Sequence, residues 1–134
     1  MAQRRILVID DEEDSREFVV AVLEEEGVEI LTARDGESGL KLALEEQPDL
    51  IILDVQMPNK DGFTVFTELK QEEATKAIPV IMLTGMAETS GIRFSKSIMG
   101  DFIGVEPRAY VEKPVNPETL TATVEEILGG EGAA

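Results

Sequence analysis

The chain is organised around the stretch Ile51-Ile52-Leu53-Asp54-Val55-Gln56-Met57-Pro58-Asn59-Lys60-Asp61-Gly62. Leu50 to Leu53 are branched aliphatic residues without polar alternation, which is typical of a strand buried on both faces in a parallel sheet. Asp54 follows at the expected C-terminal end of that strand, where open α/β sheets place their ligands. Pro58 and the pair Asp61-Gly62 then indicate a loop. Taken alone, Asp54 has a simpler interpretation, in which the acid solvates a strand end or caps a turn.

Composition limits the possible functions. The chain has 134 residues, enough for one domain with its own core. It contains no Cys, which excludes disulfides and a thiol nucleophile, and no His, which excludes a phosphohistidine carrier. No apolar run is long enough to span a bilayer, and residues 1–5 lead straight into a strand and not into a signal peptide. We therefore expect a cytoplasmic protein with no membrane contact.

The chain is strongly acidic, with a net charge of −16 from 12 basic and 28 acidic residues. Such a charge repels phosphate backbones, so nucleic acid is not expected as a direct partner. Most of this charge is expected on a solvated surface, and a minority is expected in one acidic pocket.

Four further segments are predicted as strands, namely 5–10, 28–33, 78–83 and 109–112. Helical spacing of apolar residues predicts helices between them. In the first helix, capped by Asp14 or Ser15, the expected core residues are Phe18, Val19, Val22 and Leu23. Two more are expected around residues 40–44 and 63–73. This alternation predicts a doubly wound, five-stranded parallel sheet with helices on both faces.

The last helix is predicted to begin at Asn116-Pro117, with Asn116 as N-cap. Its expected buried residues are Leu120, Val124, Ile127 and Leu128. Residues 129–134 are predicted to be a flexible tail.

The carboxyl ends of the predicted strands bring polar residues to one edge of the sheet. With their neighbours, these residues form Ile-Asp10-Asp11-Glu12, Leu53-Asp54-x-x-Met57-Pro58-x-x-Asp61-Gly62, Leu83-Thr84-Gly85 and Tyr110-Val-Glu-Lys113-Pro114. In this order the motifs resemble the receiver domain of two-component response regulators, over residues 4–128. The resemblance implies a flavodoxin-like receiver fold and, since no effector domain is expected, a single-domain regulator similar to chemotaxis regulators.

Three carboxylates at one edge repel one another, and a hard divalent cation such as Mg²⁺ relieves that repulsion. The resemblance implies Mg²⁺ as cofactor, with Asp11 and Asp54 as direct ligands and Asp10 acting through water. It also implies the backbone carbonyl of Gln56 as a ligand. Asp54 would be the nucleophile that forms an aspartyl phosphate.

Lys113, Thr84 and Tyr110 complete the set of residues that the resemblance assigns. Lys113 would neutralise phosphoryl charge, Thr84 would donate its hydroxyl to a phosphoryl oxygen, and Tyr110 would be the aromatic switch residue. Pro114 matches the position where the family holds a cis peptide bond. The alternatives are a surface lysine before a turn proline, a β-branched residue filling a strand end, and an aromatic residue packed statically on its strand.

The segment between the fourth and fifth predicted strands departs from the family pattern because it is longer than usual. We expect a short helix at 92–99 and then an irregular apolar loop that contains Phe102 and Ile103. Residues 88–108 either pack on their own domain or form a partner or dimer face.

The leading hypothesis is a phosphorylation switch whose donor is a sensor histidine kinase or a histidine phosphotransfer protein. It would act on a downstream protein target as a monomer or a weak phosphorylation-dependent dimer, and it would not be an enzyme beyond its own phosphotransfer and dephosphorylation. One alternative is a Mg²⁺-dependent phosphatase with an aspartyl nucleophile, although Gln56 stands where those enzymes place a second acid. Another alternative is a scaffold that works without phosphorylation.

Overall fold

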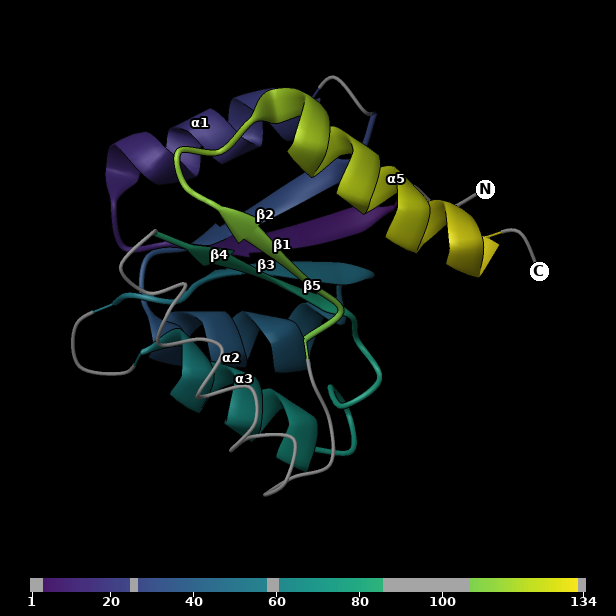
Figure 1. The fold of residues 1–134 in the computed structure, drawn as a ribbon. Coiled ribbons are helices and arrows are strands. Elements are labelled where there is room, and N and C mark those ends of the chain that lie inside the picture. The colour runs from purple at the N-terminus through teal and green to yellow at the C-terminus, as the bar shows by residue number, and fades with distance from the viewer. Residues whose placement is uncertain (1–3, 25–26, 58–60, 86–106, 133–134) are drawn as a thin grey trace.

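Strands and helices alternate along the chain in the computed structural model (Figure 1), which describes residues 4–24, 27–57, 61–85 and 107–132. The elements are β1 Arg5–Ile9, α1 Glu13–Glu24, β2 Glu29–Ala33, α2 Gly36–Glu46, β3 Leu50–Asp54, α3 Gly62–Gln71, β4 Val80–Thr84, β5 Ala109–Glu112 and α5 Pro117–Gly132. None of the helices in these ranges has a stretch long and apolar enough to cross a bilayer.

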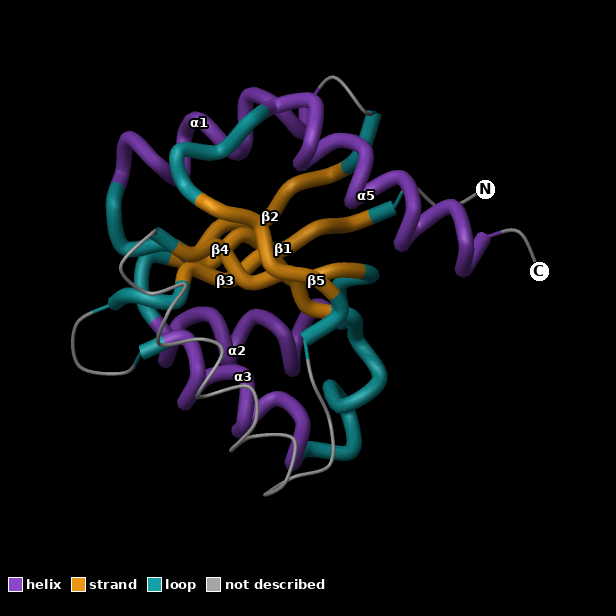
Figure 2. The backbone as a smooth tube through the Cα atoms, viewed as in Figure 1, coloured by secondary structure: helices purple, strands orange, loops and turns teal. Residues whose placement is uncertain are grey.

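The five strands form one parallel sheet, as predicted (Figure 2). Their order in the sheet is β2-β1-β3-β4-β5. Every residue of β3 and β4 is buried, which explains why these strands are continuous apolar runs in the sequence. Because all strands point the same way, the chain leaves each of them at the same edge, and residues 10, 54, 84 and 113 follow or end strands there.

Helices cover both faces of the sheet (Figure 1). Alternate strand residues such as Leu7, Leu53 and Met82 pack on one face with α2 and α3, where Phe66 is fully buried. The intervening residues, such as Val8 and Ile52, pack on the other face with α1 and α5. The sheet is therefore held between two apolar layers, and its strands have little freedom to shift.

The first helix differs from its prediction in two ways. Phe18 is 44% exposed and is not a core residue, because the buried stripe of α1 runs through Val19 and Leu23, four residues apart. Neither Asp14 nor Ser15 caps the helix, since α1 already includes both residues. The Asp10 carboxylate instead accepts a hydrogen bond from the backbone nitrogen of Glu12 at 2.9 Å.

The last helix begins as predicted and ends later than predicted. Asn116 Oδ1 accepts a hydrogen bond from the Thr119 nitrogen at 3.0 Å, and the four predicted core residues of α5 are buried. The helix continues to Gly132, so the tail predicted from residue 129 is helical as far as that residue. An established helix gains one hydrogen bond with each added residue, which offsets the cost of about 1 kcal/mol for a glycine.

The segment between β4 and β5 largely lies outside the described residues. This applies to 86–106, which includes the helix predicted at 92–99, Phe102 and Ile103.

The start of α3 lies against the backbone of Asp54. Gly62 donates its backbone N–H to the carbonyl oxygen of Val55 at 2.8 Å. A Cβ atom at Gly62 would overlap the Asp54 carbonyl oxygen and would lie 2.7 Å from the Val55 Cα. Only a residue without a side chain fits there, so Gly62 sets how closely α3 approaches the end of β3.

Replacing Gly62 by Ala should therefore destabilise the fold. The methyl group has to displace backbone atoms, and we expect the free energy of unfolding to fall by about 1–3 kcal/mol, the usual cost of overpacking. Urea unfolding measures this change. Gly129→Ala is the matched control, because nothing lies within 4 Å of a Cβ there; it should be neutral or stabilising by up to about 1 kcal/mol. Equal effects at both positions would contradict the close approach at Gly62.

Candidate functional site

Three carboxylates meet at the carboxyl edge of the sheet. Asp10 and Asp11 directly follow β1, and Asp54 is the last residue of β3, which pairs with β1. Each of the three contributes one oxygen to a group whose members all lie within 4.8 Å of one another. Asp10 and Asp54 are buried, and Asp11 is partly buried. The structure thus brings together the three acids that the sequence predicted.

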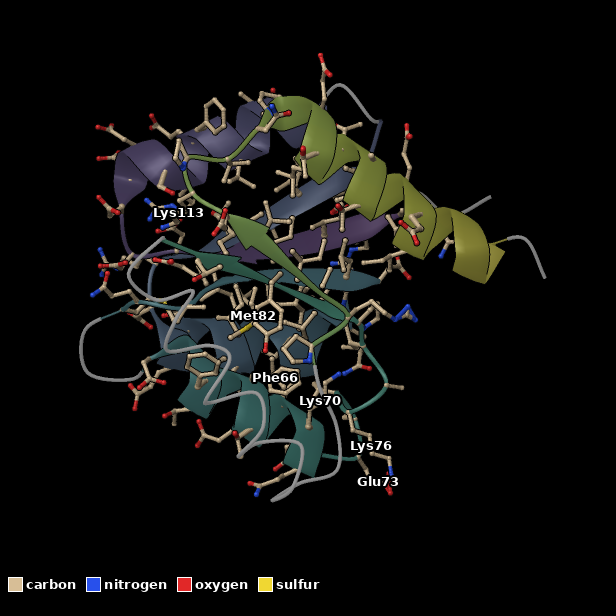
Figure 3. All side chains as sticks on the ribbon, in the orientation of Figure 1. Phe66, Lys70, Glu73, Lys76, Met82 and Lys113 are labelled. Atoms are coloured by element: carbon tan, nitrogen blue, oxygen red, sulfur yellow. The ribbon has the colours of Figure 1, made fainter. Side chains whose placement is uncertain are left out.

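A lysine lies against this cluster from the end of β5 (Figure 3). Lys113 Nζ is 2.9 Å from Asp54 Oδ1, so the interpretation of Lys113 as a surface residue does not describe its position. The peptide bond between Lys113 and Pro114 is cis, as the resemblance implied. The backbone nitrogen of Lys113 donates to the carbonyl oxygen of Thr84 at 2.6 Å, which ties the lysine to the end of β4.

The surroundings of Asp54 favour its neutral form. Its pKa is raised from the ordinary value of 3.8 to about 6, chiefly by burial and also by repulsion from Asp10 and Asp11. The hydrogen bond and the charge of Lys113 lower that pKa and only partly offset the increase. For Lys113, burial acts to lower the pKa, but the hydrogen bond from Lys113 to Asp54 and the nearby carboxylates outweigh it and raise the pKa. Asp54 is therefore a desolvated carboxylate that is paired with a cation through one of its oxygens.

Asp10 is held by several hydrogen bonds that the sequence analysis missed. Its carboxylate accepts from the Glu12 nitrogen at 2.9 Å and from Ser15 Oγ at 2.6 Å. Its carbonyl oxygen accepts from Arg16 Nη1 at 2.9 Å. The five-residue spacing between Asp10 and Ser15 could have predicted the contact between their side chains, but Ser15 was expected to be a helix cap instead.

The roles of the other three predicted residues, Thr84, Tyr110 and Gln56, stay predictions. Thr84 ends β4, is buried, and donates its hydroxyl to the carbonyl oxygen of Gly85 at 3.1 Å. Tyr110 pairs in register with Met82 and packs against the core beside α2 and α3. Because Thr84 lies two residues after Met82, Thr84 and Tyr110 point to the same face of the sheet. Gln56 is exposed and lies two residues beyond β3.

The acidic cluster has the chemistry and the size that a magnesium ion requires. Mg²⁺ prefers oxygen ligands at about 2.1 Å, so oxygens on opposite sides of the ion are about 4.2 Å apart. Oxygens within 4.8 Å of one another need only a small shift to reach that distance. Each added carboxylate also increases the repulsion that a cation relieves. The residues present therefore fit a magnesium ion.

The raised pKa of Asp54 predicts how stability depends on pH when Mg²⁺ is absent. Between pH 3.8 and about 6, the folded state keeps a proton on Asp54 that the unfolded state releases. The contribution of Asp54 to the free energy of unfolding is therefore fully present below this range and is lost as the pH rises through it.

Comparison with Asp54→Asn isolates this contribution, since asparagine does not titrate. The free energy of unfolding of the parent, relative to the variant, should fall as the pH rises to about 6 and then level off. Urea unfolding at a series of pH values in a chelator measures it. A difference between the two proteins that is flat, or that rises with pH, would mean that Asp54 is not desolvated as described.

Comparison with known proteins agrees with the family that the sequence motifs resemble. The family model described as "Response regulator receiver domain" matches residues 6–125. Protein PilH of Pseudomonas aeruginosa is 35% identical, and the match covers 94% of this chain and 98% of PilH. The crystal structure of the chemotaxis protein CheY4 of Vibrio cholerae at low pH superposes with a TM-score of 0.80 at 34% identity, covering 94% of this chain and 99% of CheY4.

A third relative is longer than this chain. The alkaline phosphatase synthesis transcriptional regulatory protein PhoP of Bacillus subtilis is 39% identical over 93% of this chain, which spans only about half, 48%, of the length of PhoP. The matches to PilH and CheY4 confirm the flavodoxin-like receiver fold. By its sequence and its fold, this chain belongs to the response regulator receiver domain family, the phosphoryl-accepting signalling domains of two-component systems.

Proposed function

We propose that this domain accepts its phosphoryl group on Asp54, from a phosphohistidine donor and with Mg²⁺ bound beside it. The observation that carries the proposal is the ion pair of 2.9 Å between Lys113 and Asp54 inside a group of three carboxylates. Among the residues that the structure describes, this is the only group of acids placed to hold a metal ion. Receiver domains generally bind Mg²⁺, and Asp11 and Asp54 would hold it here, with Asp10 acting through water and the Gln56 carbonyl as a further ligand.

In the proposed transfer, an Asp54 carboxylate oxygen forms a bond to phosphorus while the bond from phosphorus to the histidine nitrogen breaks. The electron pair of that bond leaves with the imidazole. With a pKa of about 6, Asp54 is mostly ionised at neutral pH and is competent as a nucleophile. Lys113 offsets negative charge on the phosphoryl oxygens, which is the main requirement of phosphoryl transfer. Bound Mg²⁺ would supply charge neutralisation on the other side.

The response to phosphorylation is proposed to pass through Thr84. Its hydroxyl would leave the Gly85 carbonyl and donate to a phosphoryl oxygen. Tyr110 lies on the same face of the sheet and is partly buried, so a shift of Thr84 changes the space beside its ring. This change would alter the binding of a downstream protein target. We propose that the protein acts in the cytoplasm.

Phosphorylation by acetyl phosphate tests the site directly. The parent should gain one phosphoryl group in the presence of Mg²⁺, and excess chelator should prevent the gain. Asp54→Asn should gain no phosphoryl group, because the neutral amide of asparagine lacks the carboxylate oxygen that attacks phosphorus. Intact-mass spectrometry measures each product.

The matched control is Asp61→Asn. Asp61 is an exposed acid that caps α3 through the Thr64 nitrogen at 2.8 Å, and asparagine can also make that bond. The control should be phosphorylated like the parent. A phosphoryl group that still appears on Asp54→Asn, or a reaction that runs equally well in chelator, would exclude Asp54 as the Mg²⁺-dependent acceptor.

A groove between α1 and α5 is the proposed docking site for the phosphohistidine donor. It has a volume of about 580 Å³, and its lining includes Phe18, Val22 and Pro117. α1 begins two residues after Asp11, and α5 begins four residues after Lys113, so both helices that line the groove start close to residues of the site. A protein seated there would reach Asp54, and the exposed ring of Phe18 offers it an apolar anchor.

Phe18→Ala should therefore slow transfer from a phosphotransfer protein that phosphorylates the parent. We expect a loss of about ten-fold at low donor concentration, the effect of one anchor residue worth about 1.4 kcal/mol. The rate with acetyl phosphate should stay unchanged, because that donor needs no docking surface. Both rates are measured by following the phosphorylated protein over time.

Leu44→Ala is the control, since Leu44 is equally exposed, at 45%, but lies in α2 beneath the other face of the sheet. It should change neither rate. An equal loss with both donors for Phe18→Ala would point to a damaged site, and an equal loss in both variants would rule out a specific groove.

A further inference from the structure

The three acids of the cluster differ in how firmly they are held. Every polar atom of Asp10 has a partner: its nitrogen donates to the Ala33 carbonyl at 3.1 Å, and its carbonyl oxygen accepts from Arg16. One carboxylate oxygen accepts from the Glu12 nitrogen and the other from Ser15 Oγ. Asp10 is also fully buried. Its side chain is therefore fixed in one orientation.

The other two acids are freer on the side that faces the cluster. Asp11 is partly buried, and among the described residues its side chain has no hydrogen-bond or ion-pair partner. Asp54 is paired with Lys113 through one oxygen. A cation that enters the cluster thus meets one carboxylate that is already oriented and others that can adjust to it.

We propose that Ser15 is a positioning residue for the magnesium site, acting through Asp10. The inference rests on the proposed Mg²⁺ site and adds a residue to it. The distance of 2.6 Å is that of a strong hydrogen bond from a hydroxyl to a charged carboxylate. The bond joins the first turn of α1 to the residue that follows β1, so it fixes the carboxylate relative to the sheet.

The contact leaves Asp10 able to serve the ion. A carboxylate oxygen has two lone pairs, and the bonds from Ser15 and Glu12 use one on each oxygen. The remaining lone pairs can accept from metal-bound water. Without the Ser15 hydroxyl, the carboxylate keeps only the bond from Glu12 and can turn about its Cβ–Cγ bond, and the ion then has to order it. Loss of such a partner behind a metal ligand typically weakens metal binding 10–100-fold.

The test measures Mg²⁺ affinity by isothermal titration calorimetry, independently of phosphorylation. Ser15→Ala should raise the dissociation constant about ten-fold, at the lower end of that range because Asp10 acts through water. Ser15→Thr keeps a hydroxyl and should bind within about two-fold of the parent.

Ser38→Ala is the matched control. Ser38 is the third residue of α2, as Ser15 is of α1, and it lies beside Asp35, a carboxylate outside the cluster. The Mg²⁺ affinity of the Ser38→Ala variant should equal that of the parent. In an Asp10→Asn background, adding Ser15→Ala should change the dissociation constant less than about two-fold, because the partner through which Ser15 acts has lost its charge.

Three results would overturn the role of Ser15: a parent-like affinity in Ser15→Ala, an affinity in Ser15→Thr as weak as in Ser15→Ala, or an undiminished loss in the Asp10→Asn background. If Ser15→Ala folds only with metal, the Mg²⁺ dependence of its refolding gives the same constant by linkage. A parent that binds no Mg²⁺ overturns the proposed site together with this inference. A parent that binds it while Ser15→Ala binds equally well overturns the inference alone.

Discussion

Repulsion among Asp10, Asp11 and Asp54 can persist at one edge of the sheet only because the sheet beneath them does not yield. Like charges this close would separate on a flexible loop. Here Asp10 directly follows β1 and Asp54 ends β3, and these neighbouring strands are hydrogen-bonded in register and covered by helices on both faces. The free energy of the packed core holds the acids together. The same packing buries Asp54, and burial, together with repulsion from Asp10 and Asp11, raises the pKa of its carboxyl group.

Close packing extends this rigidity to the helices. Gly62 brings α3 against the Asp54 backbone, and Gly39 brings α2 against Ile9, where a Cβ atom would lie 2.5 Å from the Ile9 side chain. Ile9 and Asp54 are the last residues of β1 and β3. Two close contacts between a helix and a strand thus lie next to the acids, where a shift of the backbone would alter the distances between them.

Apolar runs and turn residues were enough to predict the sheet, because a strand buried on both faces requires an unbroken aliphatic sequence such as 50–53. The convergence of Asp10, Asp11, Asp54 and Lys113 followed from parallel strand direction. Details that depend on a partner in another element were not predictable. The exposure of Phe18 depends on where α5 lies, and the contact of Ser15 depends on the orientation of Asp10. The late end of α5 reflects helix continuation in spite of glycine.

The three acids also differ in how firmly their side chains are held. The Asp10 carboxylate is fixed by its hydrogen bonds, and Asp11 is only partly buried. Asp54 is paired with Lys113 through one oxygen. Lys113 follows β5 and is bonded through its backbone to Thr84 at the end of β4. In the described structure it is the only cation within hydrogen-bonding distance of Asp54. A new negative charge on Asp54 would therefore act, through Lys113, on the ends of β4 and β5. Of these two strands, β5 lies at the edge of the described sheet with β4 as its one neighbouring strand, so it is held less firmly than β4, which pairs on both sides.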